Sequence, residues 1–314
     1  MWVQVLLVWV FLVMVSAVSA QDSGKGPVLV AEGLEFPEGP AWDGRGHVYV
    51  SNCHADYITR INLDGKVVRR WMTASGGDEP FTFQKTNGMR FYRDGSLFVC
   101  DFGRKAIIRV VPETGECQLY ADKCDGEPFR GPNDLAFDPE GNLYFTDPTG
   151  SNENKPVGAV YRVEQGSRKV TRVAEGLAFP NGIAFTADAQ TLFVAESNHN
   201  RILKYPVQAD GRLGQVQVFA ELAKYGSGDP DGIALDERGR LWITHYNNHR
   251  VIVLNRRGNL SRVILLSHTS PAGPTNITFA GDDLRTVCIT DPGNGGVWRM
   301  RSEVPGLRLF SFPD

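Results

Sequence analysis

Short apolar runs alternate with polar turns along nearly the whole chain, and no long helical stretch interrupts them. A typical unit has a turn that contains Gly, such as DPEGN at 138–142 or DERGR at 236–240, followed by an apolar run such as LYF at 143–145. Gly supplies the positive φ angle that such turns need, and β-branched and aromatic residues favour strands covered on both faces. The pattern predicts an all-β protein.

One phrase recurs six times at nearly regular spacing. It reads PEGPAW at 37–42, TNGMRF at 86–91, PNDLAF at 132–137, PNGIAF at 180–185, PDGIAL at 230–235 and TNITF at 275–279. Its second residue, which we call the anchor, is Glu38, Asn87, Asn133, Asn181, Asp231 and Asn276 in turn, so the period is 45 to 50 residues. Repeats of this length made of strands are typical of propellers. We predict a six-bladed β-propeller with four-stranded blades.

A second internal repeat predicts how the ring closes. The segment VAEGLEFPEG at 30–39 returns as VAEGLAFPNG at 173–182, where it leads from the third blade into the fourth. The strand around 28–31 is therefore an outer strand with no blade of its own before it. We predict that it completes the sixth blade and so joins the two ends of the chain. The segment 307–310 is a competing candidate for the same edge.

The first twenty residues have the pattern of a secretory signal. They contain no charged side chain, 5–15 is an almost unbroken apolar run, and small residues precede Gln21. The run is short for a membrane-spanning helix, although an uncleaved anchor is the alternative. We predict a signal peptide at 1–20, one propeller domain at 21–314, a secreted or periplasmic location, and no membrane attachment after cleavage.

Charge and cysteine content narrow the classes of partner. The net charge is -3 without any basic run, so we expect no nucleic-acid partner. The five cysteines have no zinc-site spacing, and after export we expect Cys117 and Cys124 to pair. No Gly-x-Ser-x-Gly motif supports a serine hydrolase. The segment 72–84 is a candidate lid or partner-binding loop.

The anchors begin the innermost strands, so they should surround one end of the central tunnel. Glu38 and Asp231 are carboxylates and the other four anchors are Asn. Such oxygens are ligands for hard cations such as calcium, and two carboxylates neutralise one divalent ion. The absence of His and Cys from the anchors argues against zinc or copper. For Asn87 and Asn276, a role in turns or in the tunnel wall is the alternative.

Other polar residues have structural interpretations. His199, His245 and His249 follow second strands, and we favour rim positions over a proton shuttle because the sequence indicates no carboxylate partner. Three acidic residues end second strands, where Asp commonly caps a turn. These are Asp101, Asp147 and Asp291.

Three segments at blade spacing carry a resemblance to a known family. They are PEGPAW at 37–42, FPNGIAF at 179–185, and PDGIALD at 230–236 with GRLWI at 239–243. The chain resembles the senescence marker protein (regucalcin)/gluconolactonase family over about residues 28 to 302. The resemblance implies one divalent cation at the tunnel mouth, calcium by preference with magnesium or manganese as alternatives. Glu38, Asn181 and Asp231 match its ligands.

The resemblance also implies hydrolysis of a small lactone, as by a gluconolactonase, or of a related ester. We expect the protein to be a monomer. Asp231 is the candidate general base or nucleophile, and Asn133 matches an Asn that touches metal or substrate. Asn133, Arg130 and Asn87 are the candidates for substrate binding. One branch of the family has a basic sugar-contacting residue before the Asn133 position, but Gly131 stands there, which removes the argument for a sugar lactone. The alternative function is a non-catalytic ligand- or partner-binding propeller with a structural calcium. Strictosidine-synthase-like and phosphotriester-cleaving chemistry are lesser alternatives.

Overall fold

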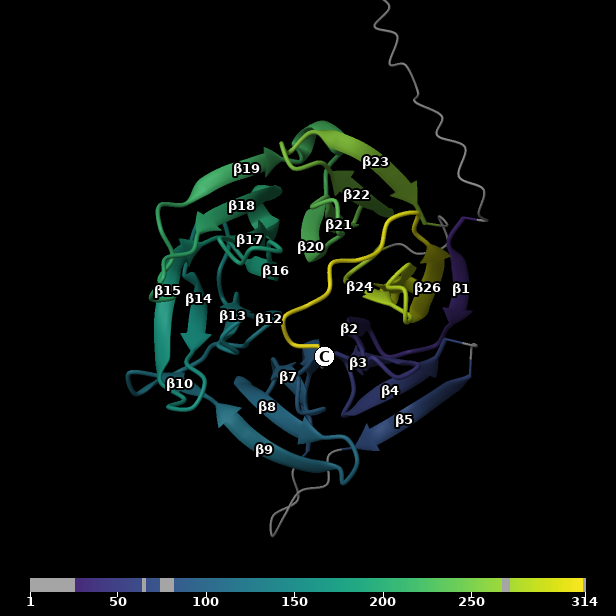
Figure 1. Ribbon diagram of the computed structural model, residues 1–314, viewed down its shortest axis with the longest axis horizontal. Helices are drawn as coiled ribbons and strands as arrows, with labels where there is room; N and C mark the ends of the chain where they lie inside the picture. Colours follow the sequence, from purple (N-terminus) through teal and green to yellow (C-terminus); the bar gives the residue numbers. More distant parts are fainter. Residues whose placement is uncertain (1–25, 64–65, 74–81, 267–271, 313–314) are drawn as a thin grey trace, which may run out of the picture.

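Six four-stranded antiparallel sheets stand like blades around a central axis (Figure 1). The computed structural model describes residues 26–63, 66–73, 82–266 and 272–312. The predicted six-bladed propeller is therefore confirmed.

Each blade runs from an inner strand at the axis to an outer strand at the periphery. Blade 1 contains β2 (Pro37–Trp42), β3 (His47–Asn52), β4 (Tyr57–Asn62) and β5 (Val67–Thr73). Blade 2 contains β6 (Thr86–Phe91), β7 (Leu97–Asp101), β8 (Ala106–Val111) and β9 (Glu116–Ala121). Blade 3 contains β12 (Leu135–Phe137), β13 (Leu143–Asp147), β14 (Gly158–Val163) and β15 (Val170–Leu177).

The second half of the chain continues the same order. Blade 4 contains β16 (Pro180–Phe185), β17 (Thr191–Glu196), β18 (Arg201–Pro206) and β19 (Gln217–Glu221). Blade 5 contains β20 (Asp229–Leu235), β21 (Leu241–Tyr246), β22 (Arg250–Leu254) and β23 (Leu260–Leu265). Blade 6 contains β24 (Ile277–Ala280), β25 (Thr286–Asp291), β26 (Gly296–Arg301) and β1 (Val28–Ala31). A short pair, β10 (Lys123–Cys124) and β11 (Glu127–Pro128), and three 3-10 turns lie in the connections.

The N-terminal strand closes the ring, as predicted. β1 pairs antiparallel with β26, with Leu29 opposite Trp298. The competing segment 307–310 forms no strand. It crosses the tunnel at the end that lies opposite the anchors (Figure 1, yellow), and Leu307 N–H donates to Leu235 O at 2.9 Å. Its side chains pack on the ends of the inner strands, so this end of the tunnel is covered.

The hydrophobic core lies between neighbouring blades rather than in one central mass. All five residues of β13 are buried, as expected for a strand covered on both faces. Phe98 of β7 packs against Phe137 of β12 with ring centroids 5.1 Å apart, which joins blades 2 and 3. Because apolar contacts between blades surround the axis, the inner strands and their polar anchors are held in fixed positions.

All five cysteines are free thiols, so the predicted Cys117–Cys124 disulfide is wrong. Cys117 lies on the outer strand β9 and packs on the core cluster that contains Met89. Cys124 is buried in the cluster that contains Phe129. The few residues between the two cysteines therefore lead from one core cluster to the next instead of bringing the thiols together.

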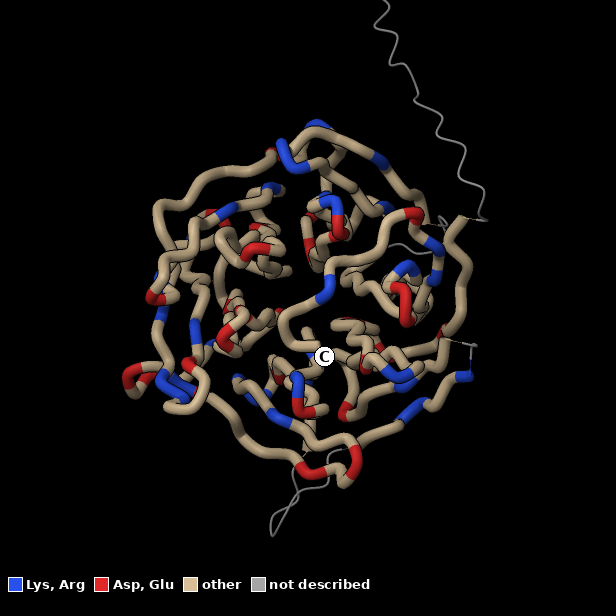
Figure 2. The backbone as a smooth tube through the Cα atoms, viewed as in Figure 1, with Lys and Arg blue, Asp and Glu red and all other residues tan. Residues whose placement is uncertain are grey.

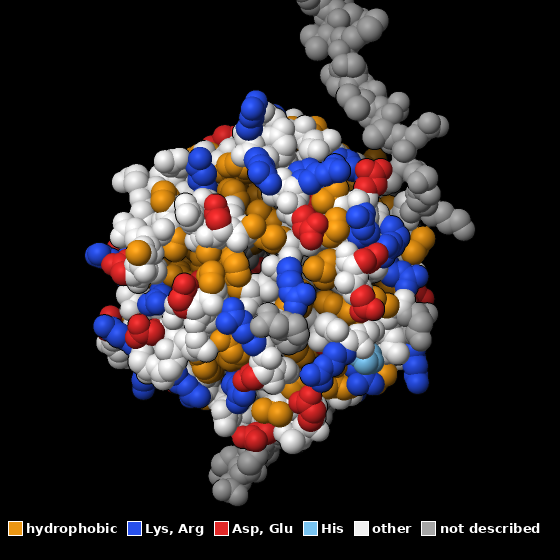
Figure 3. Space-filling model, viewed as in Figure 1, with side chains coloured by type: hydrophobic (Ala, Val, Ile, Leu, Met, Phe, Trp, Pro, Cys, Tyr) orange, Lys and Arg blue, Asp and Glu red, His pale blue; other side chains and the backbone are white. Residues whose placement is uncertain are grey.

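Charged residues of both signs are mixed along the described part of the chain. Lys and Arg are interspersed with Asp and Glu around the ring (Figure 2), and both signs are scattered over the face that carries the C-terminal segment (Figure 3). Within the part of the chain that the structure describes, no helix has the length and apolar character needed to cross a membrane. The predicted signal peptide at 1–20 and most of the predicted loop, 74–81, lie outside the described residues.

Candidate functional site

The start of each inner strand is bent so that the anchors face the tunnel. In blades 1 and 4 the ladder with the second strand shifts register between Glu38 and Ala41 and between Pro180 and Ile183. Comparable shifts occur in blades 2 and 5. Such bulges re-aim side chains and increase the local twist.

Glycine follows the anchor in four blades because the neighbouring blade comes very close. A Cβ at Gly39 would collide with Asn87 O, and a Cβ at Gly182 would collide with Asp231 O. The same holds for Gly88 and Gly232 against the anchor segments that follow them. The glycines thus allow the inner strands to gather around a narrow axis, which brings the anchors together.

Five anchors line one cavity of about 560 Å³ at the tunnel mouth. They are Glu38, Asn87, Asn133, Asn181 and Asp231, and each is buried. The sixth anchor, Asn276, is fully buried and is not part of the cavity lining. The sequence-based prediction of an oxygen-rich ring at one end of the tunnel therefore agrees with the arrangement of these side chains.

Three amide oxygens in this ring have no hydrogen-bond partner among the described residues. They are Oδ1 of Asn87, Asn133 and Asn181. Asn181 Nδ2 donates to Ser197 Oγ at 3.3 Å, which fixes the orientation of the amide. A buried acceptor without a donor is costly. The oxygens therefore fit a cation, since a cation would satisfy several of them at once.

Burial disfavours the ionised form of the two carboxylates of the ring. Burial raises the pKa of Glu38 from 4.5 to about 8, and the charge of Asp134 adds to the effect. Burial raises the pKa of Asp231 well above its ordinary value, and Glu38 and Asp134 raise it further. A divalent cation would reverse this, because an opposite charge nearby favours the ionised form. Among the described residues no three His, Cys, Asp or Glu side chains form a metal cluster, since this donor set combines two carboxylates with amides.

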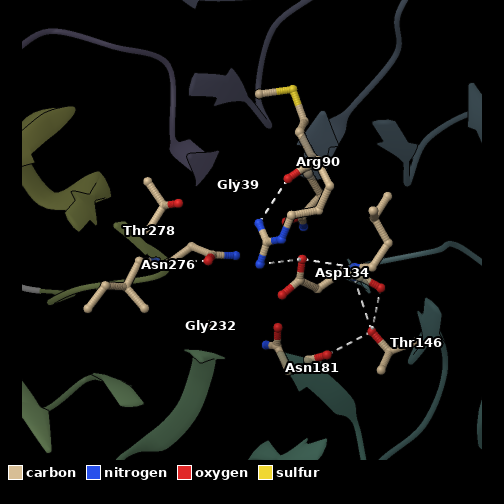
Figure 4. Close-up of polar contacts among 12 residues, drawn as sticks. Gly39, Arg90, Asp134, Thr146, Asn181, Gly232, Asn276 and Thr278 are labelled. Atoms are coloured by element: carbon tan, nitrogen blue, oxygen red, sulfur yellow. Dashed lines mark hydrogen bonds and ion pairs between the residues drawn. The ribbon is translucent and has the colours of Figure 1, made fainter. Parts of the chain in front are cut away.

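Below the mouth, an arginine and an aspartate face each other in the tunnel (Figure 4). Arg90 Nη2 lies 4.0 Å from Asp134 Oδ1, and Arg90 Nη1 donates to Met89 O at 2.8 Å. Both side chains are buried. The corresponding residue is Ala in blades 1, 3, 4 and 5, so Arg90 is the long side chain that fills this level of the tunnel. The pair thus sets the Arg90 guanidinium against Asp134, the carboxylate whose charge raises the pKa of Glu38 and Asp231.

Carboxylates at the ends of second strands hold the segments that lead into the anchors. Asp101 Oδ1 accepts from Lys85 N at 3.1 Å, and Asp147 Oδ1 accepts from Gly131 N at 2.7 Å. Asp291 Oδ1 instead accepts from Gly293 N at 3.1 Å in the turn that follows its own strand. The prediction that these residues cap turns is confirmed for Asp291 and for Asp101, whose Oδ1 also accepts from Arg104 N at 2.9 Å, but the bonds of Asp147 go to the segment before Asn133.

Two phenylalanines next to the anchors have an uncommon backbone conformation. Phe36 has φ 57° and Phe179 has φ 59°, and both side chains line the cavity. The left-handed region costs a residue with a Cβ about 1–2 kcal/mol. Strain of this kind tends to occur where a side chain must be presented to a ligand.

The cavity lining does not include Arg130, and it does not include the three histidines discussed above, His199, His245 and His249. The Arg130 side chain is exposed. His245 is buried, its Nε2 lies 2.8 Å from Asn200 Oδ1, and burial lowers its pKa to about 4. His199 has a carboxylate partner that the sequence did not indicate, because its Nδ1 lies 3.2 Å from Glu196 Oε2.

The structure adds several cavity residues that sequence reasoning missed. Cys53, His54, Lys85, Phe102 and Tyr246 all line the cavity. Burial raises the pKa of Cys53 to about 12, so its thiol is neutral and a poor nucleophile. Most of these residues lie beside the anchors or just after second strands. Their position within the repeat could therefore have identified them from the sequence.

Comparison with known proteins agrees with the fold and the repeat. The family model for the SMP-30/gluconolactonase/LRE-like region matches residues 36–292. A protein named lactonase drp35 from Staphylococcus aureus is 31% identical over 296 residues, which covers 90% of this chain and 87% of the relative. Its namesake from Staphylococcus saprophyticus is 28% identical with the same coverage.

Solved structures give the same result. A gluconolactonase from Xanthomonas campestris is 26% identical with a TM-score of 0.74, covering 89% of each chain. A calcium-binding protein, regucalcin, from Agrobacterium tumefaciens has a TM-score of 0.75 at 19% identity, covers 92% of this chain and 97% of its own, and supports the fold. Because the family match spans most of the chain and includes the inner strands of all six blades with their anchors, the chain belongs to the SMP-30/gluconolactonase/LRE-like family.

Proposed function

We propose that the protein is a metal-dependent lactonase that hydrolyses a small lactone or a related ester. One observation carries the proposal: two buried carboxylates converge on one cavity with three amide oxygens that have no hydrogen-bond partner in the described part of the chain. The relative from S. aureus is named a lactonase and that from X. campestris a gluconolactonase, which supports the same reaction class.

Glu38, Asn181 and Asp231 are the residues that would hold the cation, with calcium preferred and magnesium or manganese as alternatives. The bound ion would supply a Lewis acid that polarises the ester carbonyl. Asp231 would take a proton from the attacking water, or attack the carbonyl itself. The Asn133 amide would donate to the carbonyl oxygen as negative charge develops on it, and Asn87 would orient the substrate.

We extend the proposal to an exported, monomeric enzyme. The apolar, uncharged residues 1–20 and the small residues before Gln21 support export. The N-terminal sequence and the native mass of protein recovered outside the cytoplasm test both points: a start at Gln21 and the mass of one chain are expected. A retained N-terminus would contradict export.

The central test combines metal analysis with a lactone panel. Purified protein is assayed for bound calcium, magnesium and manganese, then for hydrolysis of γ- and δ-lactones with and without EDTA. We expect hydrolysis that EDTA abolishes and that added cation restores. A protein that binds cation but hydrolyses no lactone would contradict the proposal and favour the ligand-binding propeller.

A further inference from the structure

Hydrogen bonds join each blade to the next at the level of the anchors, and we call this set of bonds the belt. It consists of Ser51 Oγ to Asn87 O at 2.7 Å, Gly88 N to Asn133 O at 2.7 Å, Thr146 Oγ1 to Asn181 O at 2.8 Å, Ser197 Oγ to Pro230 O at 2.7 Å, Thr244 Oγ1 to Thr275 O at 2.7 Å and Thr275 Oγ1 to Pro37 O at 2.9 Å. In each bond the donor belongs to one blade and the acceptor to the segment where the next blade begins. Because the last bond returns to blade 1, the belt closes on itself.

Thr146 of β13 fixes the anchor Asn181 from the preceding blade (Figure 4). Its hydroxyl accepts from Asp134 N at 3.1 Å and donates to Asn181 O at 2.8 Å. Thr146 is fully buried, so these bonds form away from water, where they are strong. The hydroxyl thus joins the anchor segment of blade 3 to the anchor of blade 4.

Ser197 makes two bonds that connect two of the candidate ligands. Its Oγ donates to Pro230 O, the carbonyl just before Asp231, at 2.7 Å and accepts from Asn181 Nδ2 at 3.3 Å. In four of the six blades the fourth residue of the apolar run in the second strand is Ser or Thr, but in β17 it is Ala195. The hydroxyl between blades 4 and 5 comes instead from Ser197, two residues further along the chain.

Thr275 ties the first candidate ligand, Glu38, to the last blade. Its hydroxyl donates to Pro37 O, the carbonyl just before Glu38, at 2.9 Å. Thr275 O in turn accepts from Thr244 Oγ1 at 2.7 Å and from Gly232 N at 2.8 Å, so Thr275 is itself held by blade 5. All three candidate ligands are therefore fixed, at their own carbonyl or at the one before it, by a hydroxyl of the preceding blade.

The belt and the anchor glycines restrain the ring in opposite directions. The glycines that follow four anchors already touch the next blade, so the strands cannot move closer, and the belt keeps them from moving apart. A ring held in this way can present all of its oxygens at once. Ca²⁺ takes about six to eight oxygen ligands, whereas Mg²⁺ keeps several waters and binds through about one or two carboxylates. Calcium therefore depends more strongly on the spacing of the whole ring.

We propose that Thr146, Ser197 and Thr275 are positioning residues for the cation, and that their hydroxyls give the ring a preference for calcium over magnesium. The inference rests on the proposed metal-dependent function and adds residues that act through the backbone of the ligands. Loss of one hydroxyl frees one ligand to move away from the others. Calcium binding then weakens more than magnesium binding.

The test measures the dissociation constants of calcium chloride and magnesium chloride by calorimetry on protein stripped with EDTA and dialysed. The wild type should bind calcium more tightly. In each of Ser197→Ala, Thr146→Val and Thr275→Val, the ratio of the magnesium constant to the calcium constant should fall roughly three- to tenfold, the effect of one buried hydrogen bond. Thr146→Ser and Thr275→Ser keep the hydroxyl and should keep the wild-type ratio.

Thr59→Val is the matched control. Thr59 is fully buried and its Oγ1 accepts from Asn52 Nδ2 at 3.1 Å, but both residues belong to blade 1. The variant loses a buried hydrogen bond that does not join two blades, so it should lose stability and keep the wild-type ratio. A fall in this control equal to that in Thr146→Val would indicate a general loosening of the fold and overturn the inference.

The outcomes separate this inference from the proposed function. If the wild type binds neither ion, the proposed metal-dependent function fails, and the inference fails with it. If ions bind and lactones are hydrolysed, but the wild type does not prefer calcium or the folded variants keep its ratio, the proposed function stands and the role of the belt is overturned. If a Val variant does not fold, Ser197→Ala, which removes a single oxygen atom, decides the matter.

Discussion

Replacing Glu38 by Gln should stabilise the metal-free protein while it weakens cation binding. Burial raises the pKa of Glu38 from 4.5 to about 8, so the folded state binds this proton more tightly than the unfolded chain. The resulting stability is present in full below pH 4.5 and is lost as the pH rises to about 8. The difference between the two pKa values corresponds to a loss of about 5 kcal/mol of unfolding free energy above pH 8. Gln has no charge to bury, so Glu38→Gln should avoid most of this loss.

Urea unfolding in EDTA between pH 4.5 and 9 measures the effect. The wild-type free energy of unfolding should fall across this range, and the Glu38→Gln curve should fall less, with the part due to Asp231 remaining. With excess calcium the wild type should become more stable than Glu38→Gln, since only a protein that binds the ion gains stability from it. Glu32→Gln, at an exposed position after β1, is the control and should follow the wild type. Parallel pH curves for wild type and Glu38→Gln in EDTA would refute the reasoning.

The remaining predictions concern the catalytic role of Asp231, the contact between blades at Gly182, and the buried pair of Arg90 and Asp134. Asp231→Asn should lower kcat by roughly 10²- to 10⁴-fold with a folded protein, and unchanged turnover would exclude Asp231 as base or nucleophile. Gly182→Ala should cost about 1–3 kcal/mol and weaken calcium binding measured by calorimetry, because its Cβ meets Asp231 O. Gly214→Ala, with its nearest contact at 3.4 Å, is the control and should change stability little. Arg90→Met should cost about 3 kcal/mol by leaving Asp134 unpaired, and adding Asp134→Asn should recover most of it; a double variant no more stable than the single would contradict the pairing.

The repeat made the fold and the anchor ring predictable. Strand periodicity and turn glycines act locally, and a period near 48 residues leaves a ring as the arrangement that buries each blade against the next. The duplicated segment that includes Val30 and Val173 also identified β1 as a closing strand. The ring of anchors followed, because equivalent residues of a closed ring occupy equivalent places around its axis.

Features that depend on contacts between blades were not predictable. Cys117 and Cys124 are near in sequence, but each packs into a different interblade cluster. Arg90 and Asp134 are ordinary polar residues in sequence, and only the geometry of the tunnel makes them a buried pair. The position of Phe36 and Phe179 in the cavity lining was missed because hydrophobic residues are usually assigned to the core.

Closure through β1 has a consequence for how the protein is made. The partner of Val28–Ala31 is β26, at the opposite end of the chain, so this pairing forms after nearly all of the polypeptide has been synthesised. Contacts between such distant segments form slowly, because a large loop must be closed first. Until then β26 presents an unpaired edge that favours association with other chains. Folding yield should therefore depend on the first strand more than its four residues suggest: the beginning of the chain completes the last blade.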